Sequence, residues 1–230
     1  MKKILLIVIA SISLLVTGCA TKPQLPIPFE KNNFLDKNKR IGIVINDIKT
    51  PETYIVGASC LLCYGVASAA NSSLDKQLKT LPKEDIENLK HDIFNVLKNK
   101  KIKTINLENN IDIGKLKKFK SKEQNTSKKD HTIYKSDSID YLLVININML
   151  GAYRSYSSYI PTMDPVAILS GTIYLIDLNS NKYIWYKPFD YRKASSLEWD
   201  EPPMFPGMTN AYYEVITTGK DDILSNFKSL

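Results

Sequence analysis

Two cysteines separated by two residues, Cys60 and Cys63, are the side chains whose spacing most readily supports chemistry in this sequence. In an oxidising compartment, an even pair of cysteines usually forms a disulfide, which acts as a structural bridge. The same spacing serves thiol–disulfide exchange, in which the first cysteine attacks a substrate disulfide as a thiolate. A free or metal-binding pair is a third possibility. The spacing alone leaves these uses open.

The surroundings of the pair favour the structural bridge. Redox proteins of the thioredoxin type place such a motif directly after a strand, commonly with Trp before the first cysteine. Here Ser59 precedes the motif, and residues 46–59 separate it from the apolar run at 41–45. We therefore predict a disulfide between Cys60 and Cys63, with thiol–disulfide exchange as the alternative activity.

The histidines and carboxylates offer weaker candidates for catalysis. The only two imidazoles, His91 and His131, have no partner ligand three or four residues away, so we expect solvated surface histidines and no zinc or copper site. A serine or cysteine hydrolase needs a histidine base, and no G-x-S-x-G motif accompanies either one. Acidic residues cluster around Trp199, and an acid beside an aromatic ring is a common feature of glycan-cleaving sites. We favour the simpler interpretation, a solvated loop that the tryptophan anchors. These acidic residues are Glu198, Asp200 and Glu201.

An aromatic segment is the more suggestive feature. Tyr153, Tyr156 and Tyr159 recur in a serine-rich stretch that also holds Arg154. Tyrosine and serine together are typical of adaptable recognition surfaces, because tyrosine offers a wide contact area and a hydroxyl at low entropic cost. If the preceding strand continues, these are ordinary strand tyrosines, with Tyr156 on the face opposite the other two. We predict that all four residues bind a partner, and the loop 199–208 forms a second part of that surface or a rigid cover.

The elements that must position these residues follow from the apolar pattern. Residues 41–45 and 141–150 are apolar on both faces and predict buried strands, and 101–107 predicts a strand by alternation. Residues 166–178 and 182–189 predict a hairpin with its turn at 179–181. Helices are predicted over 82–99, where apolar residues recur at helical spacing, and over 209–227, although Gly219 is a potential break. Residues 60–70 predict a short packed helix or an ordered turn.

This order predicts an α+β fold, with a mixed or antiparallel sheet of about five strands and two main helices packed against it. The order is similar to that of small envelope lipoprotein domains: the amino-terminal part of the curli secretion protein CsgG, the penicillin-binding-protein activator LpoB and the polysaccharide-export protein PelC. Those relatives act in assembly, export and activation, so the resemblance implies a binding role.

The amino terminus carries an export signal. Lys2 and Lys3 precede an apolar run over 4–16 that is shorter than the roughly 20 residues a membrane span needs. Residues 16–19, Val-Thr-Gly-Cys, resemble a lipobox, the pattern after which lipoprotein signal peptidase cuts. The resemblance implies a signal peptide over 1–18, a diacylglycerol group on Cys19, usually joined by an N-acyl chain, and stable attachment to a membrane.

The rest of the chain divides into a tether and one domain. Residues 19–38 contain three prolines and predict an extended tether, and 39–230 suit a single periplasmic domain. Within it, 114–131 carries seven lysines and predicts a solvated loop, or a contact for anionic polymers or lipid head groups. Ala20 stands where inner-membrane lipoproteins often carry Asp, so in a Gram-negative host we expect the outer membrane, facing the periplasm, and otherwise the outer face of the cytoplasmic membrane.

The function expected from these features is a non-enzymatic, lipid-anchored binding or assembly module for an envelope protein or polymer. No constellation of residues compels a reaction, and we expect no cofactor beyond the lipid on Cys19. Export conflicts with a nucleic-acid partner. The sequence leaves the partner's identity, the oligomeric state and the strand order open.

Overall fold

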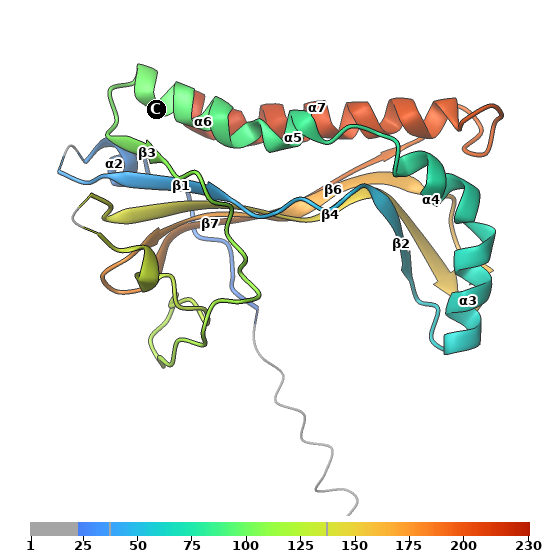
Figure 1. The fold of residues 1–230 in the computed structure, drawn as a ribbon, viewed down its shortest axis with the longest axis horizontal. Helices are drawn as coiled ribbons and strands as arrows, with labels where there is room; N and C mark the ends of the chain where they lie inside the picture. The colour runs from blue at the N-terminus through green and yellow to red at the C-terminus, as the bar shows by residue number, and fades with distance from the viewer. Residues whose placement is uncertain (1–22, 37, 137) are drawn as a thin grey trace, which may run out of the picture.

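The computed structural model describes residues 23–36, 38–136 and 138–230 (Figure 1), so the predicted signal peptide over 1–18 and the predicted lipidation of Cys19 lie outside the described residues. The helices are α2 (Lys31–Leu35), α3 (Leu61–Ala70), α4 (Ser72–Leu78), α5 (Glu84–Glu87), α6 (Leu89–Asn99) and α7 (Pro206–Lys228), with a 3₁₀ turn, η2 (Thr132–Tyr134). The strands are β1 (Ile41–Ile45), β2 (Glu52–Val56), β3 (Thr104–Asn106), β4 (Tyr141–Ser157), β5 (Ile160–Pro161), β6 (Val166–Asp177) and β7 (Lys182–Ala194).

The strands form one mixed sheet in the order β3-β1-β4-β6-β7. β1 runs parallel to β3 and β4, and β4, β6 and β7 are antiparallel to one another. The predicted α+β class is therefore confirmed, with seven strands in the described part of the chain instead of about five. The two additional strands are short and pair only with the far half of β4: β2 parallel to it and β5 antiparallel.

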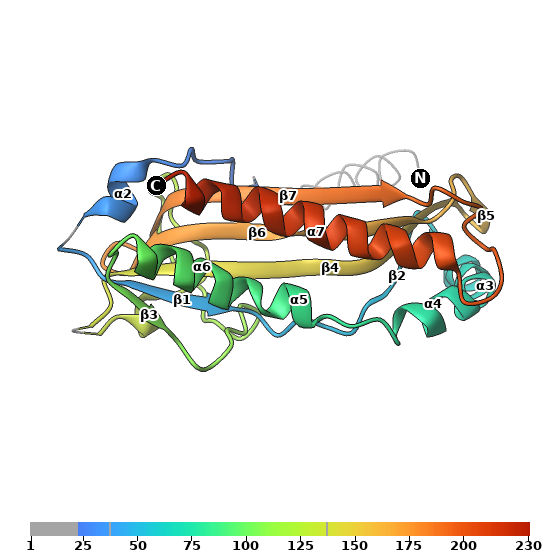
Figure 2. The same ribbon diagram turned by 90° about the horizontal axis from the view of Figure 1, so that it is seen from above.

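One face of the sheet is covered by α5, α6 and α7, which lie side by side above it in Figures 1 and 2. Their apolar stripes enter the larger core: Ile86, Leu89, Ile93 and Leu97 from α5 and α6, and Tyr212, Val215, Ile216, Ile223 and Phe227 from α7. Gly219 does not break α7. It lies against the sheet, where an added Cβ would come within 2.6 Å of Leu169 and 2.9 Å of Tyr191, so glycine permits this close helix–sheet approach.

The lysine-rich segment covers one end of the opposite face. We call residues 111–136 the basic lobe. Ile111 and Leu116 are buried with Leu142, Val144 and Ile176 in a second, smaller core. The segment is therefore more than a solvated loop: its lysines lie on the outside, and its apolar residues pack under the sheet.

The segment expected to be an extended tether is attached to the domain through a few of its apolar residues, although most of its described residues are exposed. Ile27 makes a β-bridge with Tyr186 of β7, and the α2 residue Phe34 is buried. Phe29 and Phe34 stack at 4.7 Å between ring centroids, and both rings contact Trp185 and Phe227. The domain therefore begins well before residue 39, because these aromatic rings belong to its core.

Candidate functional site

A pocket opens where the edge of the sheet is interrupted. β1 pairs with residues 141–145 of β4, and β2 pairs with residues 151–155 of the same strand. Between β1 and β2 the chain leaves the sheet through Asn46 to Pro51, and proline cannot supply a hydrogen bond to a ladder. β4 has a register shift opposite this interruption, between Ile147 and Met149. The missing stretch of edge leaves a pocket of about 400 Å³.

Side chains replace the missing strand at the back of the pocket. The Asn46 amide accepts a hydrogen bond from Ile147 N at 2.8 Å and donates one to Ile147 O at 2.9 Å. The Tyr54 hydroxyl accepts a hydrogen bond from Leu150 N at 3.2 Å. These contacts satisfy backbone groups of β4 that would otherwise lack partners, so the pocket is a built feature of the fold.

The pocket wall is rich in hydrogen-bonding groups. Asn110 donates to the Asp47 carboxylate at 2.8 Å, and Asn146 donates to Asn148 at 2.8 Å. Asp112 forms an ion pair with Lys115, which holds the pKa of its carboxyl below the usual value. The full lining is Asn46, Asp47, Ile48, Lys49, Tyr54, Ile111, Asp112, Ile113, Gly114, Asn146, Ile147, Asn148 and Leu150. Amides, carboxylates and a lysine of this kind fit a polar ligand.

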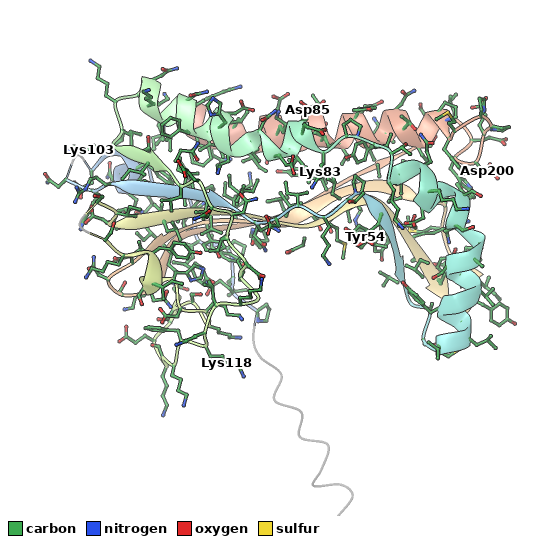
Figure 3. All side chains as sticks on the ribbon, viewed as in Figure 1. Tyr54, Lys83, Asp85, Lys103, Lys118 and Asp200 are labelled. Carbon is green, nitrogen blue, oxygen red and sulfur yellow. A yellow bond between two sulfur atoms is a disulfide. The ribbon has the colours of Figure 1, made fainter. Side chains whose placement is uncertain are left out.

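An aromatic row extends the pocket along the uncovered face of the sheet. Tyr54 of β2 is the register partner of Tyr153 of β4, so the two side chains share one face. The Arg192 guanidinium of β7 lies 4.3 Å from the centre of the Tyr153 ring. Burial raises the pKa of Tyr54, which stays a neutral hydrogen-bonding group. We call the pocket together with Tyr54, Tyr153 and Arg192 the bay; Figure 3 shows Tyr54 beneath the sheet, between the basic lobe and α3.

The structure separates the four residues predicted to bind a partner. Tyr153 lies in the bay, and Tyr159 is 60% exposed in the turn between β4 and β5. Arg154 and Tyr156 differ from the expectation, because their side chains are only 8% and 6% exposed and lie on other parts of β4. Both side chains bond to the buried Asn71. The Arg154 guanidinium donates to Asn71 Oδ1 at 3.0 Å, and Asn71 Nδ2 donates to the Tyr156 hydroxyl.

The cysteine pair fixes the start of a projecting helix. Cys60 and Cys63 form a disulfide with a Cα–Cα distance of 5.0 Å. Cys60 is the N-cap of α3, and its Sγ accepts a hydrogen bond from Cys63 N at 2.9 Å. Between the two cysteines, Leu61 is 91% exposed and Leu62 78% exposed. The stretch expected to be tightly packed is thus a helix, but one that presents apolar side chains to solvent.

The histidine and acidic residues singled out in the sequence lie outside the bay. His131 is buried in the basic lobe, contrary to the expected surface position, with Nε2 2.9 Å from the Tyr174 hydroxyl. Glu198 and Asp200 line a second open pocket of about 490 Å³, and Trp199 stacks on Arg154 at 4.5 Å. Among the described residues, no three His, Cys, Asp or Glu side chains gather to hold a metal ion.

Sequence reasoning missed Asn46, Tyr54, Asn71 and Arg192. Asn46 could be suspected only weakly, as the polar residue that follows the apolar run at 41–45. Tyr54 and Arg192 lie more than a hundred residues apart and meet Tyr153 only through sheet pairing, which no local pattern reveals.

Comparison with solved structures finds two chains with a distant similarity to this one. The lipoprotein GNA1162 from Neisseria meningitidis is 14% identical over 80% of this chain and 99% of that chain, with a TM-score of 0.26. The hypothetical protein CT253 from Chlamydia trachomatis is 11% identical over 79% of this chain and 95% of that chain, with a TM-score of 0.31. No family model and no curated protein matches the chain. These likenesses are too distant to carry an argument about function.

Proposed function

We propose that this protein is a non-enzymatic, lipid-anchored envelope lipoprotein that acts as a binding or assembly module, and that the bay holds its protein or polymer partner. The observation that carries the proposal is the interrupted sheet edge, where a polar pocket continues into the row of Tyr54, Tyr153 and Arg192. The similarity to envelope assembly lipoproteins expected from the sequence agrees with such a role.

The chemistry of the bay suits an extended polar ligand. Tyrosine rings and a stacked guanidinium offer flat surfaces for a sugar ring or a peptide side chain, and they lose little conformational freedom on binding. The amides and carboxylates of the pocket supply donors and acceptors that set its orientation. A strand of envelope polymer or an extended segment of an envelope protein offers both rings or side chains for the flat surfaces and polar groups for the hydrogen bonds.

The anchor is proposed from the lipobox. Cleavage before Cys19, with a diacylglycerol group and an N-acyl chain on that residue, would hold the domain on a membrane. In a Gram-negative host that membrane would be the outer membrane, with the domain in the periplasm; otherwise it would be the outer face of the cytoplasmic membrane. Within the part of the chain that the structure describes, no helix is long and apolar enough to cross a membrane.

Chemical crosslinking in living cells, followed by mass spectrometry, tests the binding role. The bay variant Tyr153→Ala with Arg192→Ala, which leaves the Tyr54 hydrogen bond to Leu150 N in place, is compared with Tyr213→Ala, which removes a tyrosine that is 40% exposed on α7. We expect a stable partner set with the native protein and Tyr213→Ala, and its loss with the bay variant at unchanged thermal stability. An unchanged partner set in the bay variant would refute the bay as the site.

Thiol–disulfide exchange is the second candidate, and the cysteine geometry favours it in one respect. Cys60 is exposed at a helix N-terminus, where the helix dipole stabilises a thiolate, and Cys63 is buried beneath it. Against it, no charged side chain occurs in residues 53–74 to activate the thiol further. Insulin reduction that requires both cysteines would establish this activity, and its absence in the folded protein would leave the bridge structural.

A further inference from the structure

Two parts of the molecule project in the same direction, away from α5, α6 and α7. At one end β2 and the end of β4 bend down in Figure 1, and α3 runs down beside them; at the other end the basic lobe projects in the same direction. Figure 2 shows α3 nearly end-on, as expected for a helix perpendicular to the sheet. Lys118 lies near the bottom of the lobe in Figure 3. The projections therefore flank the bay and point the same way.

The projection at the α3 end is apolar and uncharged. Residues 53–74 contain no charged side chain, and neither do residues 155–163 of the adjacent β4–β5 segment. The apolar side chains exposed here are Val56, Leu61, Leu62, Tyr64, Val66, Tyr159 and Ile160. We call these residues the apolar foot. Contiguous exposed apolar side chains mark a surface that is covered by a partner or by lipid.

Local geometry holds the apolar foot in place. Gly57 has a φ of +85°, and an added Cβ would lie 2.1 Å from Tyr156 O, so the chain turns tightly against β4 before α3. The Cys60–Cys63 disulfide then closes the first turn of the helix. Leu61 and Leu62 are thus presented on a fixed tip.

The projection at the other end is basic. The lobe, residues 111–136, holds eight lysines against three acidic residues. This difference accounts for the basic surplus of the chain after residue 18, which has 29 basic and 24 acidic residues. Lys117, Lys118, Lys120 and Lys122 have exposed side chains. Lysines gathered at one surface attract anionic lipid head groups.

The predicted anchor lies close to the lobe along the chain. Cys19 precedes the first described residue, Pro23, by four positions, so an extended chain spans at most about 14 Å between them. Gln24 donates a hydrogen bond to Asn125 of the lobe at 3.2 Å. Figure 1 shows the first described segment beneath the sheet, on the side of the two projections. A lipid on Cys19 would therefore bring that side to the bilayer.

We infer that the face opposite the helix layer rests on an anionic lipid bilayer, with the apolar foot inserted at the boundary of head groups and acyl chains and the basic lobe on the head groups. The inference goes beyond the proposed function, although it uses the same anchor. Apolar burial and attraction to anionic lipids together give binding of this kind. The bay then faces the membrane surface, where its partner is held.

Hydrogen exchange of the lipid-anchored protein tests the inference, after mass spectrometry has verified the lipid on Cys19. The protein is reconstituted in vesicles of phosphatidylethanolamine with phosphatidylglycerol, in vesicles of phosphatidylcholine alone, and in detergent micelles. We expect residues 57–66 to exchange about tenfold more slowly in both vesicles than in a variant with Leu61→Ser and Leu62→Ser. Residues 115–124 should be protected in the anionic vesicles only.

Matched variants separate insertion from general effects. Leu197→Ser with Met204→Ser removes exposed apolar side chains from the loop before α7 and should leave both protections unchanged. Replacing Lys117, Lys118, Lys120 and Lys122 by Gln should abolish the protection of 115–124. Equal exchange of 57–66 in the native and serine variants would overturn the inference. Protection of 57–66 that rises with protein density would also overturn it, because a second copy would then cover the foot.

Discussion

The apolar foot and the basic lobe project in the same direction but are built differently. The foot shows apolar side chains to solvent and is held by a disulfide and by Asn71, whose amide joins α3 to Arg154 and Tyr156. The lobe shows lysines to solvent and encloses a polar interior around Asn181. Each surface is therefore held by its own set of contacts, and each support can be removed separately.

Asn181 is the stronger of the two supports. Its Oδ1 accepts a hydrogen bond from His131 N at 3.0 Å, and its Nδ2 donates to the carbonyl oxygens of Ser127 and Lys129. It also has a φ of +57°, which alanine adopts at a cost. We expect Asn181→Ala to lower the free energy of unfolding by about 4 kcal/mol in urea denaturation, from three lost hydrogen bonds and backbone strain.

Asn181→Gly provides the control, since glycine accepts the positive φ but still loses the side-chain hydrogen bonds. It should be less destabilising than alanine by about 1 kcal/mol. A loss below about 1 kcal/mol for Asn181→Ala would show that the lobe does not depend on this residue.

Asn71 should matter somewhat less, because Arg154 keeps other contacts. Asn71→Ala removes the acceptor for the buried Arg154 guanidinium, which still donates to Met163 O at 3.3 Å and stacks on Trp199. We expect a loss of about 3 kcal/mol in the same measurement. The neighbouring exposed Ser72→Ala should change little, and equal effects of the two substitutions would contradict the role of Asn71.

The disulfide contributes through a short loop. Cys60→Ser with Cys63→Ser should lower the free energy of unfolding by about 2 kcal/mol, since closing a loop of four residues restricts the unfolded chain only modestly. Hydrogen exchange should quicken at residues 60–64 and stay unchanged in the basic lobe. Faster exchange across both regions would show that the two projections are not independently supported.

Lowering the pH should destabilise the basic lobe and leave the apolar foot unchanged, and this is the smallest of the expected effects. Burial lowers the pKa of His131, so the unfolded chain, whose histidine has a pKa near 6.5, binds a proton that the folded chain does not. The stability due to neutral His131 is complete above about pH 6.5 and falls as the pH drops toward the lower folded value, by up to about 1.4 kcal/mol at pH 5.5. Exchange corrected for intrinsic rates should quicken in 127–134 and not in 57–70; quickening of both would contradict this origin.

Much of the fold follows from local pattern. The strands at 41–45 and 141–150, the hairpin and the helix at 209–227 were predictable because each carries its own apolar period. The helix expected over 82–99 is present as two helices, α5 and α6, which are separated at Asn88. β2 and β5 were missed, since strands of five and two residues are defined by pairing with β4 and not by any pattern of their own. The continuity of α7 at Gly219 also depends on tertiary packing, which local helix propensity does not encode.

The site was predictable only in part. Tyr153 and Tyr159 could be identified as candidates from composition, and the disulfide from spacing. Arg154 and Tyr156 belong to the same segment but are buried, because strand alternation and the partner Asn71 decide which side chains reach solvent. The pocket itself depends on two strands that pair with one long neighbour and leave a gap, an arrangement visible only in three dimensions.

Site-specific photocrosslinking in living cells tests the central claim most directly. A photoreactive phenylalanine replaces Tyr153 in the bay and, in a second strain, Tyr213 on α7. The account predicts that Tyr153→benzoylphenylalanine crosslinks one defined envelope protein or polymer, while the label at position 213 does not. If the labels at positions 153 and 213 capture the same molecules, or if the label at position 153 captures none, the bay is not a binding site.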